Sequence, residues 1–147
     1  MELDLSNHWR GQFFTPYELS HMIVQVTLGA RDEVEKQLEA KGYITVLEPA
    51  CGAGAMVIAA AETMKEHGFN YQRSLHVTAV DIDPKCAHMA SVQLSLLGVP
   101  AVVVIGNSLT LEDRSHWRTP MHMLGGWEWR LRRAEARLDD RTVPLLG

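Results

Sequence analysis

The apolar positions of the chain change period along its length, and this change predicts helices first and alternating strands and helices afterwards. Residues 15–28 repeat apolar side chains at helical spacing, after a capping box of Thr15 and Glu18 around Pro16 at the first helical position. Residues 32–41 are highly charged and end before a glycine, which predicts a surface helix. We expect one face of the first helix to be buried; its residues are Leu19, Met22, Ile23 and Val26.

From residue 43 onward, short apolar runs alternate with helical patterns. The runs at 43–48, 75–81 and 101–106 are continuously apolar and rich in β-branched residues, as expected for parallel strands covered on both faces. Helices are predicted between them, at about 53–67 and about 84–97. The second of these has a packing stripe of Ala87, Ala90, Leu94 and Leu97. The pattern therefore predicts an α/β fold, a partial doubly wound, Rossmann-like sheet preceded by helices.

Three parts are expected: an N-terminal helical cap (1–42), an α/β core (43–111), and an irregular or helical tail (112–147). The tail holds three of the four tryptophans and no long strand-like run. A short helix at 127–138 would place Trp127, Leu131 and Leu138 on one side, surrounded by arginines. These arginines, with Trp127 or Trp129, could contact nucleic acid. The alternative is a solvated helix or a dimer contact, because acidic residues are interleaved.

Composition narrows the class of protein. The 147 residues are 46% hydrophobic and 22% charged, which is typical of one globular domain. The net charge of −4 does not attract nucleic acid, so any such contact needs a local patch. No apolar run approaches the roughly 20 residues of a membrane span, and the first residues do not resemble a signal peptide. The two cysteines show no metal or disulfide spacing. His116 and His122 lack the spacing of a metal pair, and we expect them on the surface or in the tail. We expect a cytoplasmic protein without membrane contact or metal.

A glycine-containing turn follows the first predicted strand. Gly52 and Gly54 bring the backbone close to whatever lies above it, because glycine has no Cβ. A third glycine, which dinucleotide-binding enzymes place three residues later, is replaced by Val57, and no phosphate-binding loop with Gly-Lys-Ser/Thr exists. NAD and nucleoside triphosphates are therefore disfavoured. The simplest alternative is a tight strand-to-helix turn that binds nothing. Cys51 in this turn is expected to be a small buried side chain rather than a nucleophile.

Polar residues end the next two strands. Asp81 can accept hydrogen bonds from both hydroxyls of a ribose, and Ile82 can lie against an adenine. Asn107 or Ser108 could contact the exocyclic amine of that adenine. Parallel strands bind ligands at their carboxyl ends, so these residues should share one crevice. Two alternatives remain open. Asp81 could cap the following helix, since Asp83 and Pro84 also look like a helix start, and Asn107 could simply favour a turn.

These segments resemble, in order, the motifs of the N6-adenine DNA methyltransferases, especially the modification subunits of type I restriction systems. The turn at 48–54, "EPACGAG", resembles their first motif, and "GQFFTP" at 11–16 resembles the motif before it. "AVDIDP" and "GNSL" resemble the second and third. The resemblance implies S-adenosylmethionine as cofactor. The residues that it assigns to the cofactor are Phe13, Phe14, Thr15, Pro16, Glu48, Pro49, Ala50, Cys51, Gly52, Gly54, Asp81, Ile82, Asn107 and Ser108.

The resemblance ends before the catalytic motif of this family. Members activate the adenine amine with (Asn/Asp/Ser)-Pro-Pro-aromatic after a fourth strand, and these 147 residues contain no Pro-Pro pair. We therefore assign no catalytic residue and expect no methylation by this chain alone. Without the family's fourth strand, residues 43–48 would be an open apolar edge. A second copy, a partner subunit or residues 112–147 would have to cover it.

Three functions fit the sequence. The first is a cofactor-binding, DNA methyltransferase-like protein that lacks autonomous catalysis, with DNA as a possible partner. The second is a non-catalytic protein that associates with a restriction-modification complex or with DNA. The third is a small-molecule methyltransferase with an unrecognised acceptor site.

Overall fold

A computed structural model describes residues 16–107, 109–110 and 112–142. Its centre is a four-stranded sheet in the order β1-β2-β3-β4. The first three strands are parallel, and β4 pairs antiparallel with β3. The strands are β1 (Ile44–Glu48), β2 (Leu75–Asp81), β3 (Ala101–Asn107) and β4 (Glu112–Arg118). The predicted α/β sheet is confirmed, with all three predicted strands within one residue of their expected ends.

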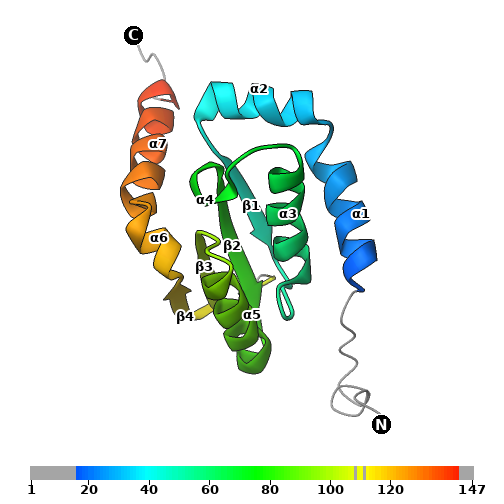
Figure 1. The fold of residues 1–147 in the computed structure, drawn as a ribbon. Coiled ribbons are helices and arrows are strands. Elements are labelled where there is room, and N and C mark those ends of the chain that lie inside the picture. Colours follow the sequence, from blue (N-terminus) through cyan, green and yellow to red (C-terminus); the bar gives the residue numbers. More distant parts are fainter. Residues whose placement is uncertain (1–15, 108, 111, 143–147) are drawn as a thin grey trace.

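Seven helices occur in the described part of the chain. They are α1 (Tyr17–Leu28), α2 (Arg31–Lys41), α3 (Ala55–Glu66), α4 (Tyr71–Ser74), α5 (Pro84–Leu96), α6 (Pro120–Leu124) and α7 (Trp127–Thr142). In Figure 1, α3 and α5 lie over the same face of the sheet, α1 runs along α3, and α6 and α7 lie on the side away from α1. α2 ends before Gly42, as the sequence predicts, and Gly42 adopts the left-handed conformation common after helices.

The core lies between the sheet and the pair α3 and α5. Along β2, Val77 and Ala79 face these helices and are fully buried, as are Ala101 and Val103 of β3. The predicted stripe of α5 is buried at its first three positions, but Leu97 is exposed because it lies just beyond the last helical turn. Alternation along β2 turns His76 to the opposite face, where α6 and α7 pack.

The predicted burial of α1 is wrong. Ser20 and Val24 are the buried residues of this helix, while the predicted face is exposed, with Val26 at 78%. The helix begins at Tyr17, one residue later than expected, and the hydroxyl of Tyr17 donates a hydrogen bond to Glu62 of α3. That bond and the His21–Glu66 ion pair hold α1 against α3 on the side of the helix that carries Ser20 and Val24. The apolar stripe therefore faces outward; it comprises Leu19, Met22, Ile23 and Val26.

The segment after residue 111 is more regular than its sequence indicates. Residues 112–118 form β4, although their composition shows no strand-like run, because they extend the sheet as a hairpin partner of β3. The predicted helix at 127–138 is confirmed and is longer, reaching Thr142. β1 pairs only with β2 and so forms one edge of the described sheet. Residues 112–142 do not pair with that edge: β4 pairs with β3 at the opposite edge, and α6 and α7 pack against His76 of β2.

Candidate functional site

The carboxyl ends of β1 and β2 are joined by a network of backbone and carboxylate hydrogen bonds. The amide of Gly52 donates to Asp81 Oδ2 over 2.8 Å, and the amide of Asp83 donates to Asp81 Oδ1 over 2.9 Å. The amide of Cys51 donates to the Val80 carbonyl over 2.8 Å. The structure thus brings together the turn and the strand end that the sequence assigned to one crevice.

Two glycines shape the turn. Gly52 has φ of 53° and Gly54 has φ of 97°, a region that side chains with a Cβ adopt at a cost. A Cβ on Gly54 would lie 3.6 Å from that of Ala90 on α5, at van der Waals contact, so Gly54 lies next to this helix. Gln93 of α5 donates to the Ala53 carbonyl over 2.9 Å and holds the turn in place. The motif did not reveal Ala90 and Gln93, because their role depends on packing between helices.

The polar side chains at the carboxyl ends of β1 and β2 retain unused acceptor positions. Each oxygen of Asp81 accepts one backbone amide and has a second lone pair, and the residue is only partly buried. Ile82 beside it is 56% exposed, an apolar surface next to a carboxylate. Glu48 accepts the amide of Ala50 over 3.1 Å, which folds the start of the turn. A hydroxylated ligand with an aromatic base has matching groups here.

Other predicted site residues take different places. Oδ1 of Asn107 accepts the amides of Leu109 and Thr110, so this oxygen serves the turn after β3, the alternative that the sequence left open. Asp83 caps α5 through the amide of Lys85, which leaves Asp81 free of that task. Pro49 and Ala50 are exposed on the turn, and Pro16 is exposed at the start of α1. Phe13, Phe14, Thr15 and Ser108 lie outside the described residues.

Cys51 is buried beneath the turn, as expected for a packing residue. Burial, followed by the charges of Asp81 and Glu48, raises the pKa of its thiol to about 12. The thiolate that a nucleophile requires is therefore scarce at neutral pH. Among the described residues, no group of three histidine, cysteine or acidic side chains is arranged to hold a metal ion.

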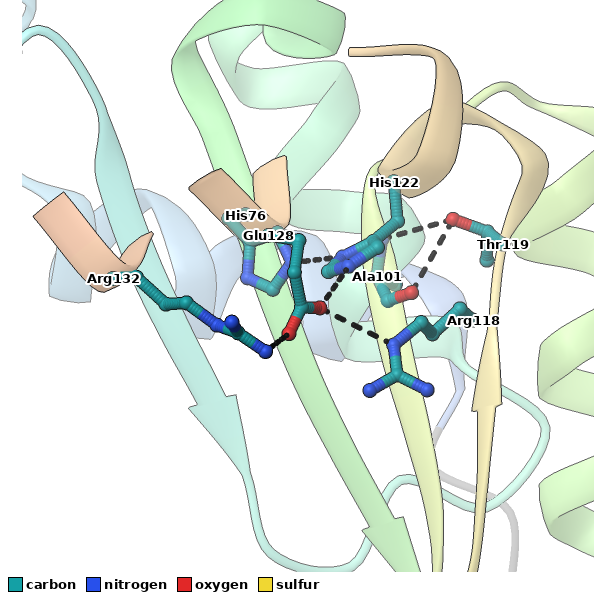
Figure 2. A network of polar contacts seen from close by, with 7 residues as sticks. All are labelled: His76, Ala101, Arg118, Thr119, His122, Glu128 and Arg132. Atoms are coloured by element: carbon teal, nitrogen blue, oxygen red, sulfur yellow. Dashed lines mark hydrogen bonds and ion pairs between the residues drawn. The ribbon is translucent and has the colours of Figure 1, made fainter. Parts of the chain in front are cut away.

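A second polar cluster lies on the other face of the sheet, and sequence analysis missed it (Figure 2). His76 Nε2 and His122 Nδ1 are 2.9 Å apart, and His122 Nε2 is 3.3 Å from Glu128 Oε2. Arg118 and Arg132 also bind the Glu128 carboxylate, at 3.4 and 2.9 Å. The hydrogen bonds from His122 and Arg132 hold the pKa of Glu128 below its ordinary value. His122 is therefore a buried residue of α6, contrary to the surface role expected for it, whereas His116 is exposed as expected.

The same cluster anchors α7 to the sheet. Trp127 is fully buried against His76, with ring centroids 5.2 Å apart, and against Tyr43 at 5.3 Å. The guanidinium of Arg130 lies 3.8 Å above the Trp127 ring and 5.2 Å from that of Tyr43. Burial lowers the pKa of His76 to about 4, helped by the charges of His122 and Arg130. The neutral imidazole is thus part of the packed interface.

A glycine turn and a strand-ending acid at the carboxyl ends of parallel strands are typical of nucleotide-binding α/β proteins. Comparison with known protein families identifies the family of this chain. The family model described as N-6 DNA Methylase matches residues 5–124, and the chain belongs to that family. Searching the curated proteins found no match.

One solved structure that resembles the chain is described as a class I S-adenosylmethionine-dependent methyltransferase from Listeria monocytogenes. It has 18% sequence identity and a TM-score of 0.45. The match covers 63% of this chain and 27% of that chain, so the matched part corresponds to only about a quarter of that protein's length. In the described part of the chain, no helix combines the length and apolarity that crossing a membrane requires.

Proposed function

We propose that the carboxyl ends of the parallel strands, together called the carboxyl edge of the sheet, bind S-adenosylmethionine. The observation that carries this proposal is the Gly52–Asp81 hydrogen bond, which sets the glycine turn against a carboxylate with two unused acceptor positions. Asp81 would accept the ribose hydroxyls, Ile82 would pack against the adenine, and the turn at 48–54 would approach the amino-acid end. Family membership supports this choice of ligand over other adenosine compounds. When bound, the cofactor supplies an electrophilic methyl group.

Equilibrium dialysis with labelled S-adenosylmethionine tests this site. Asp81→Ala should weaken binding by at least about tenfold, because two hydrogen bonds to a charged acceptor are lost. Asp32→Ala, which removes an acid from the first turn of α2, is the matched control and should bind as the native chain does. Equal affinity of the two variants would refute the assignment.

We further propose that this chain does not methylate adenine on its own. The 147 residues contain no Pro-Pro pair, and the described sheet has β1 at its edge, where a further strand could pair. The groups that activate the adenine amine would then come from another polypeptide, which would pair with β1 and contact DNA. Transfer of tritiated methyl groups to unmethylated DNA by the purified chain would contradict this, while transfer only after a partner subunit is added would support it.

The exposed stripe of α1 favours a second function, that of an interaction protein. Four apolar side chains of one helix face outward; they are Leu19, Met22, Ile23 and Val26. A protein whose main task is docking on a restriction-modification complex would use such a surface. The dialysis experiment distinguishes the two functions, since a purely docking protein would bind its complex without binding S-adenosylmethionine. Met22→Lys should abolish docking and leave cofactor binding unchanged.

A further inference from the structure

A cavity of about 560 Å³ lies near the amino ends of the parallel strands, together called the amino edge of the sheet. Gly52 and Asp81 lie at the opposite, carboxyl edge. Its walls come from α4, α6 and α7, and its size is that of a small-molecule site. Two arginines and two carboxamides supply its polar lining, and two side chains of α6 supply its apolar lining. No carboxylate is among the lining residues. In a protein of net charge −4, such a lining favours an anion.

One of the two arginines is already fixed in place. Nη1 of Arg130 donates to the Arg73 carbonyl over 2.9 Å, and Nη2 donates to the Gly42 carbonyl over 3.5 Å. The guanidinium also stacks on Trp127. A guanidinium has five N–H donors, so three remain for a ligand after these two bonds. Binding would cost Arg130 little conformational entropy, because its side chain is ordered beforehand.

A buried donor without an acceptor lies behind the same wall. The indole Nε1 of Trp127 has no hydrogen-bond partner among the described atoms, although the side chain is fully buried. It lies next to Gly125, which lines the cavity; a Cβ there would come within 2.7 Å of Nε1. Such a donor is costly to leave unsatisfied.

A second cavity, of about 320 Å³, adjoins the first and shares Asn70 and Gln72 with it. It adds Lys65 and two aromatic residues, Phe69 and Tyr71. The hydroxyl of Tyr71 donates to the Leu97 carbonyl over 2.6 Å, which holds that ring in position. Aromatic rings beside a cationic pocket are the surfaces on which nucleic-acid bases stack.

We propose that the two cavities together bind a nucleoside monophosphate. The phosphate occupies the first cavity against Arg73 and Arg130, and the base lies in the second against Phe69 and Tyr71. The site is separate from the proposed cofactor site, since the two lie at opposite ends of the strands. It therefore does not depend on the proposed function.

Calorimetric titration of the full chain with adenosine monophosphate tests this site. We expect saturable binding with a dissociation constant below about 1 mM. Arg73→Ala should raise that constant at least about tenfold, because it removes a charged donor from the phosphate. Arg133→Ala is the matched control; this exposed arginine of α7 lies over Trp129 and should be replaceable without effect. Asp81→Ala should also leave the constant unchanged, which separates this site from the cofactor site.

Two further ligands test the two halves of the proposal. Inorganic phosphate lacks the base and adenosine lacks the phosphate, so each should bind at least about tenfold more weakly than the monophosphate. Absence of saturable binding would overturn the assignment. So would identical constants for Arg73→Ala and Arg133→Ala, or phosphate binding as tightly as the nucleotide.

Discussion

The two edges of the sheet are built in different ways. At the carboxyl edge, a turn of seven residues and one strand-ending acid form the candidate site through backbone hydrogen bonds. At the amino edge, side chains from β2, β4, α6 and α7 assemble a packed cluster around Trp127 and the His76–His122 pair. The first site joins two short sequence motifs that follow neighbouring parallel strands, so the motifs reveal it. The second exists only once the chain has folded.

Removing Trp127 should produce the largest effect. Trp127→Ala deletes a fully buried indole and the ring beneath Arg130, so we expect a loss of about 3–5 kcal/mol in the free energy of unfolding. Urea denaturation measures it. Trp129→Ala, which truncates a side chain that is 63% exposed on the same helix, should change stability by less than about 0.5 kcal/mol. Similar losses for the two variants would mean that α7 is not anchored as described.

The second-largest effect should be a loss of stability in acid, caused by His76 at the amino edge. The pKa of His76 is lowered from 6.5 to about 4, so the unfolded chain takes up this proton more readily than the folded one. The stabilisation is therefore complete above pH 6.5 and is lost as the pH falls toward 4, by about 2–3 kcal/mol. His76→Gln should flatten this slope in denaturation series across that range. His88→Gln, at an exposed position of α5, should preserve it, and a slope that survives His76→Gln would contradict the assignment.

At the carboxyl edge, two glycine substitutions distinguish a loss of stability from a loss of ligand binding. Gly54→Ala and Gly42→Ala both place a Cβ at positive φ, 97° and 82°, and each should cost about 1–2 kcal/mol of stability. Only Gly54 belongs to the turn, so only Gly54→Ala should also weaken S-adenosylmethionine binding. The comparison uses urea denaturation and dialysis on both variants. Weakening by Gly42→Ala as well would indicate a general loss of stability rather than a local site.

The smallest effect should come from the outward stripe of α1. Val26→Ala should change the free energy of unfolding by less than about 0.5 kcal/mol, whereas Val24→Ala, two residues earlier and buried, should cost about 1–2 kcal/mol. Thermal melts of the two variants suffice. If Val26→Ala lost more stability than Val24→Ala, the face predicted from the sequence would be the buried one, and the proposed interaction surface would not exist.

Sequence predicted the parts of the fold that local pattern determines. The continuous apolar runs located β1, β2 and β3, and the Asp83-Pro84 pair located the start of α5. The turn and Asp81 meet as predicted because parallel strands end at a common edge.

What the sequence could not predict depends on tertiary contacts. β4 was missed because its residues are polar and become a strand only by pairing with β3. The face of α1 was assigned wrongly, because periodicity identifies an apolar stripe and not the neighbour that covers it. His122 gave no signal at all, since its burial depends on β2 and α7 meeting around it.

Amide NMR of the full chain during titration with S-adenosylmethionine compares both edges in one experiment. We predict saturable shifts at Gly52, Gly54 and Ile82, with the amides of α6 and α7 unchanged. Shifts confined to α6 and α7, or none at saturating ligand, would contradict a cofactor site at the carboxyl edge.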